Sequence, residues 1–113
     1  MANSFVNKKA DLTSNSATTL YTVPSFSTAV IKSILVSEDS GNADTITVTI
    51  TDTSDNVFSL FKTKAISANA TTELLSAPLI AQESEVIKVT AATANRLHVI
   101  LSALEITPRE VTT

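Results

Sequence analysis

The chain of 113 residues contains no cysteine and no tryptophan, and it has only one glycine, one histidine and one tyrosine. Without cysteine, it can form neither a disulfide framework nor a metal site built from thiolates. A single glycine also excludes the glycine-rich loops that bind phosphate groups through the backbone. Because glycine is so scarce, the turns must be built mainly from asparagine, aspartate, serine and proline.

Positive charge and long apolar segments are scarce as well. The net charge is −3, and basic residues cluster only at Lys8–Lys9 and at Lys62 and Lys64, which is not the basic stripe of a nucleic-acid-binding protein. No run approaches the roughly 18 apolar residues that a membrane span needs, and the first residues, MANSFVNKK, lack the apolar stretch of a secretory signal. We therefore expect no nucleic-acid partner, no membrane partner and no export through such a signal.

The sequence offers little material for catalysis. His98 is the only imidazole, so a serine-type triad or a histidine metal cluster would have to be built around it alone. A histidine at a strand surface or at a seam between subunits is the simpler interpretation. Tyr21 is the only tyrosine, so an aromatic platform for sugar binding is poorly supported. We expect no catalytic residues and no cofactor.

Apolar and polar residues alternate with a period of two along most of the chain, which indicates β-strands, whereas helical spacing is nearly absent. The predicted strands cover residues 4–12, 18–23, 28–38, 45–52, 57–65, 71–76, 78–84, 85–91 and 96–106. Short strands separated by frequent turn signals are typical of a sandwich. The prediction is an all-β fold, a single β-sandwich of about eight antiparallel strands, jelly-roll or immunoglobulin-like.

No linker or internal repeat divides the chain, so we expect a single domain. The sandwich is expected to span residues 1–106, with a short N-terminal arm at 1–8. Residues 107–113 follow as a C-terminal arm, because Pro108 is unfavourable in a central strand. Both arms are candidates for reaching a neighbouring subunit.

Two predicted strands, 28–38 and 96–106, are apolar on both faces. A two-layer sandwich normally leaves one face of each strand in water, so an apolar second face implies cover from a third layer, a loop or another subunit. Strict alternation puts Val30, Ile34 and Val36 together on one face of the first strand. The interface candidates are Val30, Ile34, Val36, His98, Ile100, Leu104 and Ile106. A third layer is improbable in so short a chain, which favours a homo-oligomer.

Carboxylates gather in two turns, EDSGNAD at 38–44 and TDTSDN at 51–56. Oxygen ligands in turns are typical of calcium sites, although neither turn has the spacing of the helix–loop–helix motif. Weak calcium candidates are Asp39, Asp44, Asp52 and Asp55. Aspartate and asparagine in turns also bond their own backbone, which explains these residues without a metal. A calcium-dependent or carbohydrate-binding adhesion module therefore remains an alternative, and the main hypothesis contains no metal.

The segment DTITVTITD at 44–52 separates two kinds of side chain. Ile46, Val48 and Ile50 share one face of the predicted strand. The other face carries the threonine row, which consists of Thr45, Thr47, Thr49 and Thr51. Ice-binding surfaces repeat such rows on several strands, but only one strand carries the full row here. β-Branched threonine is a good strand former, so we predict that the row faces water or forms the polar rim of an interface.

Four segments in order, ATTLYTVP, TAVIKSILVSEDSGNADTITVTITD, LLSAPLIAQESEVIKVTAA and LSALEI, carry a family resemblance that covers roughly residues 3–106. The chain resembles small β-sandwich virion structural proteins of tailed bacteriophages, of the type found in marine and cyanobacterial phages. The resemblance implies no catalytic residues. It implies a subunit that binds other proteins of the virion.

The first expectation from this resemblance is a capsid decoration or cement protein that lies on the phage head. A neck, tail or fibre-attachment subunit is the alternative within the same class. The implied partners are the major capsid protein or other virion proteins, together with further copies of the chain, among which a trimer is favoured. The implied location is the virion, after synthesis in the cytoplasm of a bacterial host.

Overall fold

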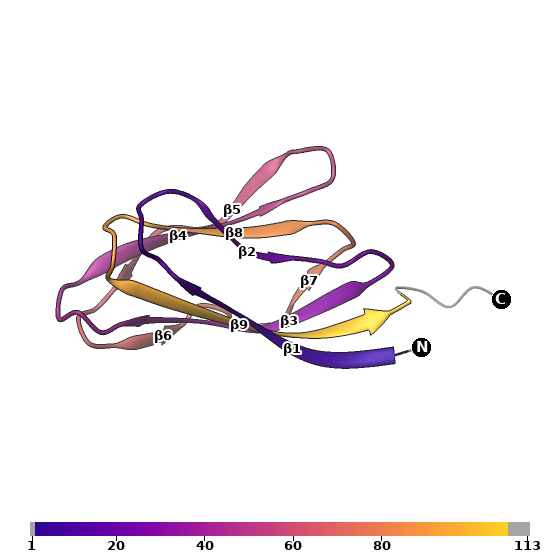
Figure 1. The fold of residues 1–113 in the computed structure, drawn as a ribbon, viewed down its shortest axis with the longest axis horizontal. Helices are drawn as coiled ribbons and strands as arrows, with labels where there is room; N and C mark the ends of the chain where they lie inside the picture. Colours follow the sequence, from indigo (N-terminus) through magenta and orange to yellow (C-terminus); the bar gives the residue numbers. More distant parts are fainter. Residues whose placement is uncertain (1, 109–113) are drawn as a thin grey trace.

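A computed structural model describes residues 2–108, which form nine antiparallel strands and no helix (Figure 1). The strands are β1 (Ala2–Asp11), β2 (Thr18–Thr22), β3 (Thr28–Glu38), β4 (Asp44–Thr51), β5 (Val57–Ile66), β6 (Thr71–Glu73), β7 (Leu79–Ala81), β8 (Val86–Ala91) and β9 (Leu97–Thr107). Sheet A has the order β1-β9-β3-β6, with β7 also paired to β3, and sheet B has the order β2-β8-β4-β5. The predicted all-β sandwich is confirmed.

The pairing of the strands is nested. The first strand pairs with the last, β2 pairs with β8, β3 pairs with both β6 and β7, and β4 pairs with β5 at the centre of the sequence. This is an antiparallel ribbon folded over so that its strands fall into two sheets, which is the order of a jelly roll. Of the two sandwich types expected from the sequence, the strand order is therefore that of the jelly roll.

The ends of the chain differ from the expectation. The predicted N-terminal arm at 1–8 is wrong for the described residues, because β1 pairs with β9 without interruption from Ala2 to Asp11. At the other end, β9 continues to Thr107, and Pro108 follows it. Residues 109–113 of the predicted C-terminal arm lie outside the described residues.

The core lies between the two sheets and consists of their inward-facing apolar side chains. Its largest fully buried members include Leu12, Tyr21, Ile31, Ile34, Ile46, Ile66, Ile87, Leu97 and Leu101. Tyr21 also links the sheets near one end, because its hydroxyl donates a hydrogen bond of 2.6 Å to the carboxylate of Glu105 in β9. Burial and this carboxylate both raise the pKa of Tyr21, so the phenol stays protonated and keeps donating.

A β-bulge at Lys32 changes which residues of β3 face the core. Ile31 lies opposite Ala103 and Ser33 lies opposite Ser102, so Lys32 has no partner in β9 and alternation restarts after it. The expectation that Ile34 and Val36 share the outer face with Val30 is therefore wrong. Ile34 and Val36 are fully buried in the core. The bulge therefore explains why apolar residues of both parities, Ile31 before it and Ile34 and Val36 after it, enter the same core.

Glu38, the last residue of β3, is a buried carboxylate that joins two turns. Its Oε2 accepts hydrogen bonds from the backbone N–H and the hydroxyl of Ser40, and its Oε1 accepts from the N–H groups of Gly41 (3.1 Å) and Asn69 (3.0 Å). Burial alone would raise the pKa of Glu38, but these hydrogen bonds outweigh it and lower the pKa to about 2. The turn after β3 and the turn after β5 are thus held by one charged group.

Candidate interaction surface

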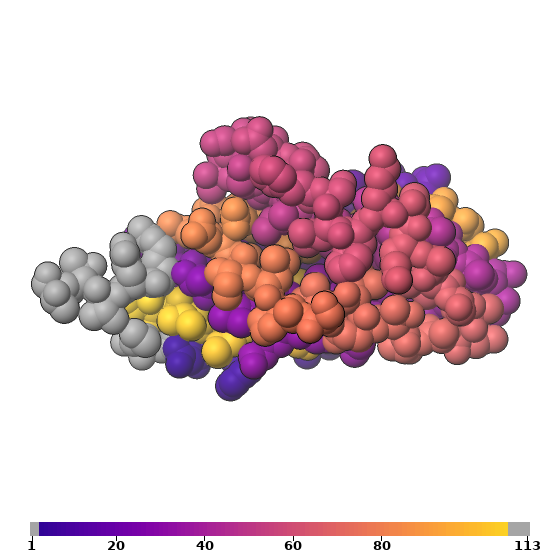
Figure 2. All heavy atoms as spheres, turned by 180° about the vertical axis from the view of Figure 1, so that it is seen from behind, coloured from indigo at the N-terminus to yellow at the C-terminus, as the bar shows by residue number. Residues whose placement is uncertain are grey.

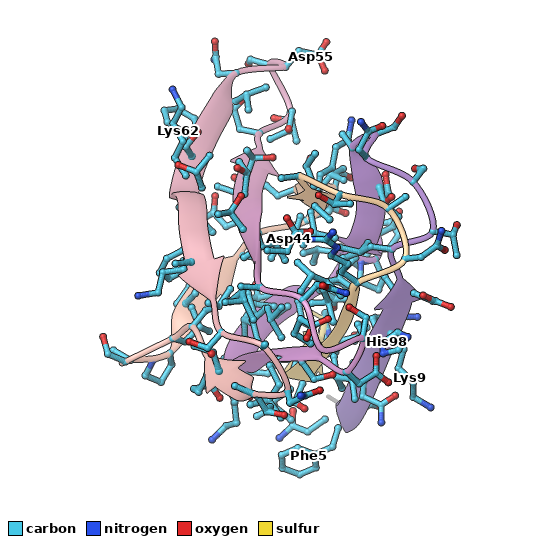
Figure 3. All side chains as sticks on the ribbon, turned by 90° about the vertical axis from the view of Figure 1, so that its left-hand side faces the viewer. Phe5, Lys9, Asp44, Asp55, Lys62 and His98 are labelled. Atoms are coloured by element: carbon cyan, nitrogen blue, oxygen red, sulfur yellow. The ribbon has the colours of Figure 1, made fainter. Side chains whose placement is uncertain are left out.

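The outer face of sheet A carries an apolar row that crosses four strands. Phe5 of β1 lies opposite Leu104 of β9, Leu104 lies opposite Val30 of β3, and Val30 lies opposite Ile80 of β7. The ends of the row are the most exposed: 80% of the surface of Phe5 and 55% of that of Ile80 is accessible to solvent. Figure 3 shows Phe5 projecting away from the body of the protein. We call these four residues the apolar row.

More apolar side chains flank the apolar row on the same face. Ile106 pairs with Asn3 and Thr28 on one side, and Ile100 pairs with Leu35 on the other. Ile100 is 39% exposed. Between the apolar row and Ile100, the outward-facing residues Asn7, Ser102 and Ser33 form a polar row across β1, β9 and β3. Ile100 and Leu35 are therefore a separate apolar pair on this face.

Along β4 and β8 the outer face of sheet B is polar, whereas Val57 and Phe58 at the start of β5 are exposed apolar residues. In β4, Ile46 and Val48 are fully buried, whereas the threonine row points outward and is partly exposed. In the neighbouring strand β8, Thr90 lies opposite Thr47 and Lys88 lies opposite Thr49. The alternation predicted for this strand is confirmed, and the two outer faces of the sandwich differ in chemistry.

Of the seven interface candidates, the structure brings Val30, Ile100, Leu104 and Ile106 together on one face, whereas Ile34 and Val36 are in the core. Two members of the apolar row, Phe5 and Ile80, were missed by reasoning from sequence. Phe5 falls both in the strand predicted at 4–12 and in the arm expected at 1–8, and Ile80 lies in a three-residue strand that follows a proline. The strand prediction at 4–12 placed Phe5 on a sheet but did not show which residues of other strands it meets.

The seventh interface candidate, His98, lies at the end of this face near Asp11 and Asp39 (Figure 3). Its Nε2 is 3.3 Å from the Oδ1 of Asp11, and its Nδ1 is 3.8 Å from the Oδ2 of Asp39. All three side chains are largely open to solvent, so the ion pairs contribute little to stability. In the register of sheet A, His98 lies opposite Asp11 of β1 on one side and opposite Ser37 of β3 on the other.

The calcium candidates lie in separate places. Asp39 is next to His98, and Asp44 accepts a hydrogen bond of 3.0 Å from the N–H of Thr93. Asp52 and Asp55 lie at the other end of β4, in the hairpin that rises from the sandwich in Figures 1 and 2. Among residues 2–108, no three carboxylate or imidazole groups are placed to hold a metal ion.

Asp52 instead organises the hairpin loop. Its Oδ1 accepts hydrogen bonds from the backbone N–H groups of Ser54 (2.9 Å) and Asn56 (3.0 Å). The bond from Asn56 is the main reason that the pKa of Asp52 is lowered. Its role is that of an aspartate that closes a turn on its own backbone.

Three hollows on the surface are open depressions. The largest, about 440 Å³, lies at the end of sheet B beside Asp44, Ile66 and Arg96. A second, about 270 Å³, lies beside Phe5 and Lys32 on the outer face of sheet A. The third, about 240 Å³, has apolar walls: Leu60, Phe61, Leu74, Leu75, Pro78 and Leu79. None of the three encloses a volume in which a small molecule would be largely buried.

No protein-family model, no curated protein and no solved structure matches this chain. Within the described residues there is no helix that could cross a membrane. The fold and the surface together define the class of the protein: a small jelly-roll sandwich with an apolar row on the outer face of sheet A.

Proposed function

We propose that this chain is a non-enzymatic structural subunit of a virus particle and that it binds its partner through the outer face of sheet A. The observation that carries the proposal is the difference between the two outer faces. A monomer gains nothing from exposing Phe5 and Ile80 at opposite ends of a continuous apolar row, whereas a subunit that buries this row gains affinity.

Burial of the apolar row contributes to the free energy of assembly. Burying a large apolar side chain contributes about 1.5–3 kcal/mol, so Phe5 and Ile80 together supply about 2–4 kcal/mol when allowance is made for their partial exposure. Stable interfaces bury roughly 1,200–2,000 Å² in total, which needs most of one face of a small domain. The apolar row would form the centre of such an interface, and the polar residues beside it, such as Asn7 and Ser102, would form its rim.

The partner is proposed from the family resemblance together with the fold. The chain resembles small virion structural proteins of tailed phages, and jelly rolls are common in viral capsid domains. Because one fold serves many functions, this part rests on analogy. We favour a decoration or cement protein on the head, bound to the major capsid protein, over a subunit of the neck, tail or fibre base.

The number of copies per particle tests this proposal. In purified virions, quantitative mass spectrometry should find this chain at a copy number comparable with that of the major capsid protein. A few dozen copies or fewer would replace the decoration role by a place in the neck, tail or fibre base. Complete absence of the chain from the particle would overturn the virion function itself.

A single substitution tests the binding face. Ile80→Lys puts a charge at the exposed end of the apolar row, and we expect particle binding to weaken about tenfold to a hundredfold because a charge must be buried at an apolar contact. The matched control is Thr45→Lys, which adds the same side chain to the outer face of sheet B opposite the uncharged Ala65. Both variants should melt like the wild type. Equal loss of binding in the two variants, or in neither, would contradict the assignment of the face.

A further inference from the structure

Three of the four sheet edges in the described residues are short or irregular, whereas β1 is long and regular and carries Lys8 and Lys9. In sheet B, β5 contains the positive-φ residue Thr63 and pairs irregularly with β4, while β2 is five residues long with a register shift after Thr19. The opposite edge of sheet A is split into β6 and β7, of three residues each. The edge strand β1 has ten residues, no proline and no register shift. Long regular edges of this kind are templates for pairing with another chain.

The backbone groups on this edge can be identified from the register. Leu12 follows β1, and its N–H donates a hydrogen bond of 3.0 Å to the carbonyl of Leu97. Residue pairs along an antiparallel ladder alternate between bonded and non-bonded, so the even-numbered residues of β1 share the hydrogen bonds with β9. The N–H and C=O groups of the odd-numbered residues therefore point away from the sheet. These residues are Asn3, Phe5, Asn7, Lys9 and Asp11.

We infer that β1 pairs with β1 of a second copy of this chain, antiparallel and about a two-fold axis through Asn7. In this register Asn7 lies opposite Asn7 of the second copy, Phe5 opposite Lys9, and Asn3 opposite Asp11. This register pairs all five odd residues through their outward-pointing backbone groups, and the C=O of Asp11 also accepts a hydrogen bond of 2.9 Å from the N–H of Thr13 in its own chain. Centring the axis one residue earlier, on Val6, sets Phe5 opposite Asn7 and loses its contact with Lys9, and centring it on Lys8 sets two lysines against each other.

The side chains fit this arrangement on both faces. On the outer face, the chain of Lys9 covers the exposed ring of Phe5 of the second copy, which combines apolar contact with a cation–π attraction. On the inner face, Lys8 lies opposite Val6, so its apolar stem extends over a small side chain while its charge stays in water. No two like charges are placed opposite each other.

The pairing extends sheet A across two copies and brings both outer faces to the same side. Phe5 ends the apolar row at the β1 edge, so the two apolar rows approach each other across the axis. This inference is independent of the proposed role in a virus particle, because it concerns the purified chain alone. An isologous pair closes at two copies, so the trimer implied by the family resemblance does not arise from this contact.

The oligomeric state of the purified chain tests the inference. Sedimentation equilibrium and light scattering should show a reversible dimer whose population rises with concentration. Phe5→Lys places lysine opposite Lys9 twice in the dimer and should weaken dimerisation about tenfold or more. The double variant Phe5→Lys with Lys9→Glu converts both contacts to opposite charges and should restore dimerisation at low salt. Ile80→Lys, at the far end of the apolar row, should leave the dimer unchanged.

Each alternative result overturns the inference. A monomer at all concentrations up to millimolar, or a trimer, excludes the two-fold pair. Loss of the dimer in Ile80→Lys with retention in Phe5→Lys would place the contact on the face of the sheet. If the double variant stays as weak as Phe5→Lys, then Phe5 and Lys9 are not opposite each other.

Three further variants test the backbone pairing and the register of the two β1 strands. The N–H of Asn7 points away from β9, so Asn7→Pro removes no bond within the sheet but blocks the centre of the dimer. We expect a folded monomer with the wild-type melting temperature. Because the chain has no cysteine, Asn7→Cys introduces a unique thiol, which a short bis-maleimide should cross-link into a dimer. Asn3→Cys should not cross-link, since the two thiols would be roughly 27 Å apart along the paired strands.

Discussion

Deletion of Lys32 is expected to unfold the domain, whereas Lys32→Ala should leave the fold and its stability nearly unchanged. Lys32 is the extra residue of the bulge in β3, and alternation restarts after it. If Lys32 is deleted, strict alternation continues through β3, so the core residues of one half of this strand must point outward. If the second half turns, Ile34 and Val36 are lost from the core together with the buried carboxylate of Glu38.

The expected size of this effect follows from burial. Exposing Ile34 and Val36 removes about 3–6 kcal/mol of apolar burial, which is a large part of the roughly 5–15 kcal/mol by which a domain of this size is stable. Circular dichroism melts and proton NMR dispersion check the outcome. The side chain of Lys32 is exposed, so the alanine variant controls for its loss. A deletion variant that melts cooperatively at the wild-type temperature would show that β3 does not need the bulge.

Glu38→Gln is expected to lower the melting temperature at neutral pH by on the order of 10 °C. The carboxylate of Glu38 accepts hydrogen bonds from Ser40, Gly41 and Asn69 with both of its oxygens. Glutamine has one acceptor oxygen, and its NH₂ group faces donors that it cannot bond. Backbone N–H groups in two turns therefore lose their partners. Asp39→Asn, an exposed carboxyl-to-amide change in the same turn, is the matched control.

The same residue makes stability depend on pH. The pKa of Glu38 is lowered to about 2 in the folded protein from its ordinary value of 4.5. A group with a depressed folded pKa stabilises the fold above its unfolded pKa, and this contribution disappears as the pH falls through the interval between the two values. Glu73 and Asp52 also have lowered pKa values and act in the same direction.

Thermal melts from pH 7 to pH 2 measure this dependence. The wild type should lose stability below about pH 5 and continue to lose it toward pH 2, because the folded protein binds protons less readily than the unfolded chain. In Glu38→Gln the decline should be shallower, since one of the depressed groups is gone. An equal decline in both proteins would contradict the role assigned to the buried carboxylate.

The two proposals make separate demands on the same sheet. Particle binding uses the face of sheet A, and self-pairing uses the edge of β1, with Phe5 common to both. Ile80→Lys should therefore lose particle binding and keep the dimer, whereas Asn7→Pro should lose the dimer and keep an intact apolar row. The pair of variants distinguishes failure of one proposal from failure of the other.

Alternation along single strands was sufficient to predict an all-β sandwich. It also placed Ile46 and Val48 inside with the threonine row outside, because the faces of a strand alternate whatever its neighbours are. The same pattern predicted that Ile100, Leu104 and Ile106 point outward. The prediction holds because β9 itself contains no bulge, so its side chains alternate along its whole length.

Other features depended on the tertiary structure. Which residues of β3 face the core after Lys32 depends on the pairing of β3 with β9. The bulge reverses the alternation at Lys32, and the order of polar and apolar residues in the sequence does not reveal it. Residues 2–8 form a strand because β9 offers an unpaired edge to them. The apolar row joins Phe5, Val30, Ile80 and Leu104, which lie far apart in sequence. The sequence by itself determined how side chains alternate within each strand. Only the nested pairing of the strands decided which side chains meet across the sheet, because contacts between segments far apart in the sequence set the register of neighbouring strands.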